Sequence, residues 1–241
     1  MFGLGTIINT VFIILGGIFG HFFGKLLNER IQTALPVACG VSVLFIGIGG
    51  ALEGMLSANG AVISSGRGVF IVVCMLLGAL VGEILNIEGW FEKFGEWLKK
   101  KTGNAKDKNF VEGFLNASFT VCIGAMAIVG AIEDGLTGDY SILLTKSILD
   151  LIIVMVMTSS MGKGPVFSFI PVFLLQGTVT VLAKVIQPVL TEESLGNLSM
   201  VGSILIFCVG INLVWGKKVK VANLLPAIIF AVAFAFLPFN L

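Results

Sequence analysis

A lysine and an aspartate stand one helical turn apart inside an apolar stretch of this chain. Lys146 and Asp150 interrupt residues 141–161, which are otherwise Ile, Leu, Val, Met and small hydroxyl residues and are long enough to cross a bilayer. An ionised group at membrane depth costs at least about 2.5–3.5 kcal/mol, so it is usually kept for a task and faces protein or water. At positions i and i+4 of one helix the two side chains can form an ion pair. The pair therefore indicates either a structural link between helices or a polar site on the path of a solute or ion.

Further polar side chains occur in the other apolar stretches. Each one alone is typical of a hydrogen bond between helices, but together with a lysine and an aspartate they exceed what packing requires. We therefore expect a site near mid-membrane for a small solute or ion, with Asp150 as the coupling or cation-binding carboxylate and Lys146 as its charge partner. The other residues expected to line the path are Asn9, Asn116, Ser118, Gln176 and Asn212.

Motifs of enzymes, pumps and metal sites are missing from the sequence. His21 is the only histidine, and no GxSxG or HExxH motif occurs, so hydrolytic catalysis is not expected. No Walker A or glycine-rich dinucleotide loop is present, which excludes a nucleotide-driven pump built from this chain alone. The four cysteines lie in different apolar stretches without CxxC spacing and are predicted to be packing residues. We expect no enzymatic activity, no cofactor, no metal and no nucleic-acid partner.

The elements that must position these residues are membrane-spanning helices. Of 241 residues, 56% are hydrophobic and 12% charged, against about 25% charged residues in a soluble domain. A spanning helix needs about 20 apolar residues, and such stretches predict an all-α protein with eight spans in the lipid bilayer. The predicted spans are 3–26, 34–56, 68–86, 111–132, 141–161, 165–184, 198–215 and 221–239.

The charges of the connecting segments predict the orientation. If the N-terminus lies outside, most lysines and arginines fall on the inner side, and only Arg67 and Lys184 lie at outer ends. The outer segments instead carry acidic residues, among them Glu133 and Glu192. This positive-inside distribution predicts eight spans with both termini outside. Because Met1–Gly5 carries no basic residue, no cleavable signal is expected and the first span is retained.

Residues 87–110 form a long polar segment between the third and fourth predicted spans. Aromatic residues such as Trp90, Phe94 and Trp97 recur at helical spacing, while glutamates and lysines occupy the other face. The pattern predicts an amphipathic helix at the cytoplasmic membrane surface, followed by a connector. The helix is either a membrane-surface brace or a docking site for a cytoplasmic partner.

Glycines mark predicted contacts and weak points of the helices. Gly16, Gly20 and Gly24 share one face of the first span, and such small-xxx-small faces let backbones approach closely. The ladder predicts either a seam within one chain or the interface of a homo-oligomer. Other residues are expected to weaken the second and sixth spans, namely Gly47, Gly49, Gly50, Pro165, Pro171 and Gly177.

Short internal similarities favour a duplication. Ile7-Ile-Asn9 resembles Ile148-Leu-Asp150, and Gly50-Ala-Leu-Glu53 resembles Gly130-Ala-Ile-Glu133. Many transporters are built from repeated units with the site between them, so these matches favour an ancient duplication. Chance similarity between apolar segments is the alternative.

Several short motifs in a fixed order resemble a known family. Among them are Gly5-Thr-Ile-Ile-Asn9, Gly113-Phe-Leu-Asn-Ala-Ser118, Lys146-Ser-Ile-Leu-Asp150, Gly210-Ile-Asn212 and Asn223-Leu-Leu-Pro226. From about residue 3 to about 238 the chain is similar to the YdfK/YqgA family of bacterial inner-membrane proteins, which is catalogued as a domain of unknown function. The resemblance implies a polytopic protein of the bacterial plasma (inner) membrane, expected to be a transporter, and supplies no established substrate. Family members often have Asp-Gly where this chain has Asp150-Leu151.

The sequence therefore predicts transport of a small solute or ion, by a secondary transporter or a channel. The alternative is a membrane sensor or assembly scaffold without transport activity, in which segment 87–110 contacts a partner.

Overall fold

The structure, a computed structural model, describes residues 3–59, 62–189 and 191–236, and almost all of them are helical. The long helices are α1 (Leu4–Leu26), α2 (Glu29–Met55), α3 (Gly68–Leu85), α7 (Ser141–Met161) and α10 (Glu192–Trp215). The shorter helices are α4 (Ile87–Lys101), α5 (Phe110–Cys122), α6 (Ala125–Leu136), α8 (Phe169–Val181) and α12 (Pro226–Phe234). Single turns are α9 (Ala183–Ile186), α11 (Val221–Leu224), η1 (Gly164–Ser168) and η2 (Gln187–Val189). The all-α fold class is confirmed.

Several helix ends follow local signals in the sequence. Thr191 precedes α10, and its side-chain oxygen accepts a hydrogen bond from Ser194 N at 3.2 Å, which satisfies one of the free N–H groups of the first turn. α7 and α10 stop at Gly162 and Gly216, whose φ angles of 84° and 75° favour glycine. Local residues thus set the end of α7 and both ends of α10, two of the helices that carry candidate site residues.

A short β-hairpin joins α2 to α3. Strand β1 (Leu56–Asn59) is antiparallel to β2 (Val62–Ser65), with Leu56 opposite Ser65 and Asn59 opposite Val62. The hairpin was not expected from the sequence, because four-residue strands are too short to show a clear alternating pattern.

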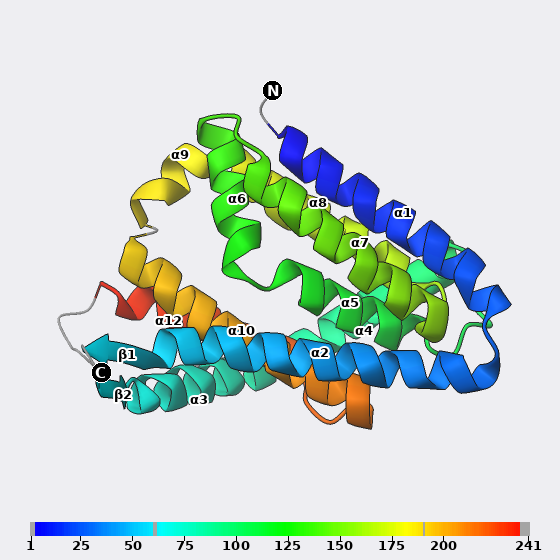
Figure 1. The fold of residues 1–241 in the computed structure, drawn as a ribbon, viewed down its shortest axis with the longest axis horizontal. Coiled ribbons are helices and arrows are strands. Elements are labelled where there is room, and N and C mark those ends of the chain that lie inside the picture. Colours follow the sequence, from blue (N-terminus) through cyan, green and yellow to red (C-terminus); the bar gives the residue numbers. More distant parts are fainter. Residues whose placement is uncertain (1–2, 60–61, 190, 237–241) are drawn as a thin grey trace.

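The helices pack in two groups that converge at one end of the molecule (Figure 1). In one group α1 lies along α7, with α8 and α6 packed beside them. In the other group α2 lies along α10, and α12 packs on both α10 and α3. α4 and α5 lie near the converging end, so they connect the two groups.

The glycine ladder of α1 packs within the chain. A Cβ atom added at Gly16 would lie 2.4 Å from the carbonyl oxygen of Leu151, and one at Gly20 would lie 2.3 Å from that of Met155. Contacts this short require glycine, because the backbones of α1 and α7 touch there. The ladder is therefore the seam between α1 and α7 and not the interface of a homo-oligomer.

The break expected in the second span is absent. α2 continues through Gly47, Gly49 and Gly50, and a Cβ atom at Gly47 would lie 2.5 Å from Phe207 N on α10. Gly47 therefore allows α2 and α10 to pack closely. This packing compensates for the helix stability that a glycine costs. In the sixth span, Pro165 lies in η1, and α8 runs unbroken past Pro171 and Gly177.

A break occurs instead in the predicted fourth span, residues 111–132. This segment is not one straight helix, because α5 and α6 meet at a bend of 59°. Gly124 lies at the bend with φ 146° and ψ 148°, a backbone conformation that glycine adopts readily. Irregular backbone at membrane depth is tolerated where protein or a cavity surrounds it.

Among the described residues, six helical segments are long and apolar enough to cross a membrane, and α5 with α6 would make a seventh. The predicted eighth span, 221–239, reaches beyond the described residues, and its described helical part is the shorter segment Val221–Phe234. The count of eight spans therefore stays a prediction.

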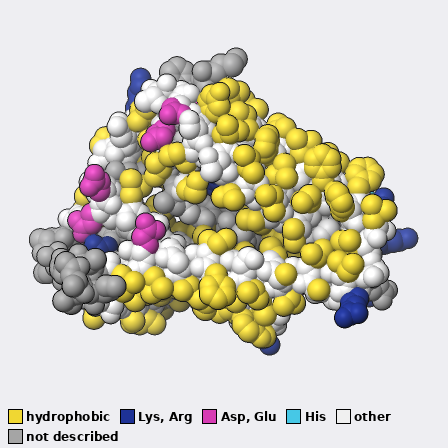
Figure 2. All heavy atoms as spheres, viewed as in Figure 1, with side chains coloured by type: hydrophobic (Ala, Val, Ile, Leu, Met, Phe, Trp, Pro, Cys, Tyr) yellow, Lys and Arg dark blue, Asp and Glu magenta, His cyan; other side chains and the backbone are white. Residues whose placement is uncertain are grey.

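Charged side chains gather at the ends of the molecule, and apolar side chains cover the surface between them (Figure 2). On the face shown, acidic groups cluster at the end where the two helix groups diverge, and most basic groups lie at the opposite end. Large apolar side chains such as Phe45 and Ile84 are 70% and 74% exposed. Exposed apolar helix faces of this extent belong in contact with lipid.

α4 packs on α5 through aromatic side chains. The ring centroids of Phe91 and Phe119 are 5.4 Å apart, and those of Phe94 and Phe114 are 5.9 Å apart. Trp97 stacks on Phe94 with ring centroids 5.7 Å apart and remains 56% exposed. The amphipathic segment predicted from the sequence is thus a helix with one docked face, and its position at a membrane surface stays a prediction.

Candidate functional site

Lys146 and Asp150 form a buried ion pair on α7. Lys146 Nζ lies 2.5 Å from Asp150 Oδ2, and the two residues are only 7% and 3% exposed. The predicted spacing of one helical turn thus brings the charges together, as i and i+4 positions allow. Because α1 and neighbouring helices cover this face of α7, the pair is held away from lipid.

A second polar pair lies between α1 and α8. Asn9 Nδ2 donates a hydrogen bond to Gln176 Oε1 at 3.2 Å, and both residues are buried. Asn9 Oδ1 and Gln176 Nε2 have no hydrogen-bond partner among the described residues. The Asn9 side chain also interacts with the Asp150 carboxyl, so the amide pair and the ion pair are linked.

One helical turn further along, Thr6 and Thr180 continue the contact between α1 and α8. Their hydroxyl oxygens lie 3.3 Å apart. We call the three contacts Thr6–Thr180, Asn9–Gln176 and Lys146–Asp150 together the polar ladder. Its members come from the three helices α1, α7 and α8.

Asp134, near the end of α6, adjoins the start of α1. Its Oδ2 accepts a hydrogen bond from Gly5 N at 2.9 Å, its Oδ1 is unpartnered among the described residues, and the residue is fully buried. The sequence predicted only acidic outer segments there, so this contact was missed. The signal that could have found it is an acidic residue next to glycine at the end of an apolar stretch.

A cavity of about 450 Å³ opens at the threonine end of the polar ladder. Thr6 and Thr180 line it, and Lys184 lies at its edge with residues of α1, α6 and α8. We call it the α1/α8 cavity. Asn9 and Gln176 lie one turn beyond the threonines and are not among the residues that line the cavity.

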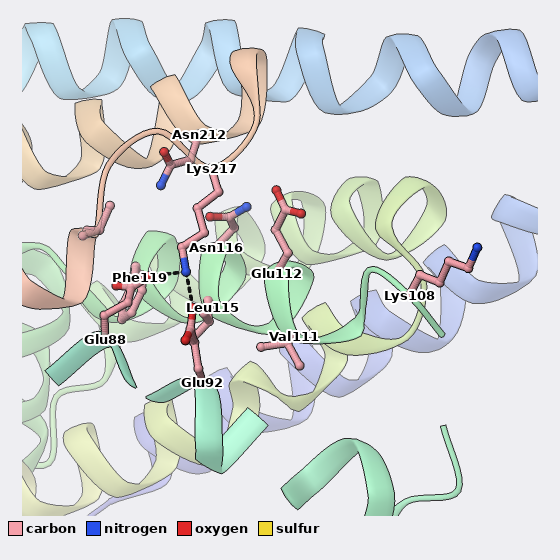
Figure 3. Close-up of a pocket in the computed structure, with 11 residues that line it drawn as sticks. Glu88, Glu92, Lys108, Val111, Glu112, Leu115, Asn116, Phe119, Asn212 and Lys217 are labelled. Carbon is pink, nitrogen blue, oxygen red and sulfur yellow. Dashed lines mark hydrogen bonds and ion pairs between the residues drawn. The ribbon is translucent and has the colours of Figure 1, made fainter. Parts of the chain in front are cut away.

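A separate polar pocket of about 200 Å³ lies between α4, α5 and the segment after α10 (Figure 3). We call it the α4/α5 pocket. Lys217 reaches across it to Glu88 at 2.9 Å and also pairs with Glu92. Glu88 is buried, and its second carboxylate oxygen accepts a hydrogen bond from Ala222 N at 3.0 Å. Burial alone would lower the pKa of Lys217, but the hydrogen bonds and charges of Glu92 and Glu88 outweigh it and raise the pKa above its usual range.

Asn116 and Asn212 line the α4/α5 pocket instead of the polar ladder. Asn212 Oδ1 accepts hydrogen bonds from Lys218 N and Val219 N, each at 2.8 Å, so this side chain fixes the turn after α10. Asn116 Nδ2 has no partner among the described residues.

Ser118 lies elsewhere again. It lines a cavity of about 630 Å³ between α4, α5, α6, α8, α10 and α12, whose wall is mostly apolar and includes Gly124 at the α5/α6 bend. The seven residues predicted for one path therefore divide among three places. Lys146, Asp150, Asn9 and Gln176 meet, whereas Asn116, Asn212 and Ser118 do not join them.

Lipid-exposed helices around a buried ladder of charges and amides define the class of protein as a polytopic helical membrane protein. The chain belongs to the family described as protein of unknown function (DUF554), whose model matches residues 4–236. This result confirms the resemblance found in the sequence motifs.

Two curated relatives match nearly the whole chain. The uncharacterized membrane protein YdfK of Bacillus subtilis (strain 168) is 32% identical over 225 residues, which cover 93% of this chain and 92% of that protein. The uncharacterized protein YqgA of Escherichia coli (strain K12) is 29% identical over 232 residues, which cover 95% and 94%. No solved structure matches the chain.

Proposed function

We propose that the protein is a secondary transporter of a small solute or ion and that the polar ladder is its site. The observation that carries the proposal is the buried Lys146–Asp150 pair, linked to amide atoms that lack partners among the described residues. A buried polar atom without a partner costs about 1–3 kcal/mol, and a buried ion pair is often no more stable than apolar side chains of similar volume. Groups this costly favour a task beyond packing.

The α1/α8 cavity supplies an approach to this site. A solute entering past Thr6 and Thr180 would meet the free atoms of Asn9 and Gln176 and then the Asp150 carboxylate. In this role Asp150 binds a cation or a proton. While the site is empty, Lys146 neutralises the charge of the Asp150 carboxylate. Loading Asp150 would weaken its pairing with Lys146 and also its contact with Asn9 on α1, and this second contact would couple occupancy to the packing of α1 against α7.

A carrier fits this arrangement better than an open channel. Neither Lys146 nor Asp150 lines the α1/α8 cavity or the α4/α5 pocket in the described structure. Both residues are buried, at 7% and 3% exposed, so access to the charges requires a change in helix packing. We place the protein in the bacterial plasma membrane with both termini outside, because most basic residues then lie inside.

Flux into proteoliposomes tests the proposal. With an imposed membrane potential, we would measure proton entry with an enclosed pH-sensitive dye and cation entry with radioactive sodium. We expect flux with the wild type, and none with Asp150→Asn or with Lys146→Met combined with Asp150→Leu. The double variant should keep at least the wild-type melting temperature, because it removes both charges together.

A matched control changes an ion pair outside the site. Glu96 and Lys99 pair on α4 at 4.0 Å with spacing i, i+3, and the variant Glu96→Gln with Lys99→Met should leave flux unchanged. A stable Lys146→Met, Asp150→Leu protein with wild-type flux would show that the pair is only structural. Wild-type flux no greater than that of empty liposomes for both ions would reject a cation or proton carrier.

A further inference from the structure

The α4/α5 pocket presents a free acceptor and a free donor on one face of α5. Glu112 and Asn116 are one helical turn apart, and Figure 3 shows both rising from α5 toward the segment that carries Lys217. Spacing of i and i+4 places two side chains side by side. They can therefore contact one small molecule together.

Both groups lack partners in the described part of the chain. Asn116 is 4% exposed. Its Nδ2 can donate two hydrogen bonds, and no acceptor among the described residues receives either of them. Glu112 is half-buried and has no ion pair or hydrogen bond to another described residue. A buried amide left without an acceptor is costly, so a ligand that accepts from Asn116 would be favoured.

Lys217 adds a positive charge opposite these two groups. Its pairing with Glu88 and Glu92 fixes the ammonium at the pocket, and its side chain is still 41% exposed. An ammonium carries three N–H donors, so one remains for a ligand. The pocket thus offers full charges of both signs within about 200 Å³.

We propose that the α4/α5 pocket binds a small zwitterion, a molecule with one ammonium and one carboxylate, such as a free amino acid. The carboxylate would accept hydrogen bonds from Asn116 Nδ2 and Lys217, and the ammonium would pair with Glu112. A simple anion would face Glu112, and a simple cation would leave Asn116 unpaired, so neither satisfies the pocket. At about 30 Å³ per water displaced, the volume suits a solute on the order of six heavy atoms. This site is separate from the polar ladder and extends beyond the transport proposed for it.

Binding to the purified full-length protein in detergent tests this assignment. We would follow the melting temperature while titrating glycine and L-alanine, with acetate and methylammonium as probes that carry one charge each. A saturable rise is expected for the two zwitterions only. Glu112→Gln should weaken the apparent affinity at least about 10-fold, because the ammonium loses its charged partner. Asn116→Ala should weaken it as well, and Glu96→Gln, on the same inner segment but outside the pocket, should not.

Several outcomes would overturn the assignment. These are a failure of both zwitterions to produce a saturable shift, an equal response to acetate or methylammonium, and an unchanged affinity in Glu112→Gln. Because Glu112→Gln keeps the shape of the side chain, its result stands even if Asn116→Ala fails to fold. Asp150→Asn separates the two sites, since it should abolish flux and leave zwitterion binding intact.

Discussion

Asn9 and Gln176 join α1 to α8 by a single hydrogen bond and leave one polar atom each without a partner in the described structure. Changing one of them removes the partner of the other, whereas changing both removes the whole polar contact. These two cases have different energies, because the desolvation cost of a buried polar group is paid in full only when it is left unpaired. The stability of the pair can thus be measured without knowing whether the protein binds a ligand.

We predict that Gln176→Met destabilises the protein by about 1–3 kcal/mol, since it removes the acceptor of the hydrogen bond from Asn9 Nδ2 and leaves Asn9 only its contact with the Asp150 carboxyl. Adding Asn9→Leu should restore part of this loss, because both amides are then gone, and the remainder reflects the lost contact of Asn9 with the Asp150 carboxyl. Thermal or denaturant unfolding in detergent measures both variants. A double variant that is less stable than Gln176→Met would contradict this expectation and show that Asn9 stabilises the protein mainly through the Asp150 carboxyl.

Residue spacing within one helix predicted the Lys146–Asp150 contact, because the geometry of one turn is fixed. The Asn9–Gln176 contact spans 167 positions, and a list of polar residues cannot say which ones will meet. For the same reason Asn116 and Ser118, two residues apart on α5, were expected to face one path. Positions i and i+2 point to different sides of a helix, and they line different cavities.

At the scale of helices, glycines set how closely neighbours approach. Gly16, Gly20 and Gly24 bring α1 onto the backbone of α7, and the distances in the structure leave no room for a side chain at these positions. The sequence predicted the glycine face of α1 but not that this face would contact α7, because a small-residue face can pack against any helix of matching shape. The α5/α6 bend was missed because Gly124 stands in an apolar stretch with no proline or charge to mark it.

We predict that Gly20→Leu pushes α1 away from α7 and destabilises the protein by about 1–3 kcal/mol or more, as overpacking of a tight contact does. Gly49→Leu is the matched control, because nothing lies within 4 Å of a Cβ atom there. Melting temperature and oligomer size in detergent would be compared. A lower oligomer size with normal stability in Gly20→Leu would contradict a seam within the chain.

At the scale of the whole molecule, the two groups of helices place opposite charges at opposite ends. The acidic end includes the first turn of α10, where Glu192 and Glu193 lie, and the basic end includes Lys217 and Lys218 after the same helix. The distribution of charged residues along the sequence predicted that the two ends carry opposite charges. This distribution depends only on which connecting segments hold the charges and not on how the helices pack. The division of helices into two groups depends on contacts far apart in sequence and could not be read from it.

We predict that cysteines introduced at Lys106 and Lys218 are labelled only from the cytoplasm, and one at Glu193 only from outside. The four native cysteines would first be replaced, and membrane-impermeant reagents applied to intact cells and to inverted vesicles. Labelling of all three positions on the reverse sides would invert the orientation. Opposite results at Lys106 and Lys218 would mean an odd number of spans between them.

The pairing of α1 with α7 also sets an order in time for biosynthesis. Gly16 and the Leu151 carbonyl that it meets are about 135 residues apart, a delay of about 7–27 s at ribosomal speeds of about 5–20 residues/s. Throughout this interval α1 is in the membrane before its partner has been made, with Asn9 and a bare glycine backbone on its surface. The hydrogen bond from Asn9 forms later still, because its acceptor Gln176 is on α8, which is made after α7. A nascent chain halted before α8 would already hold α1 and α7 in the bilayer and still lack the amide pair, so the polar ladder is complete only after α8 has been made.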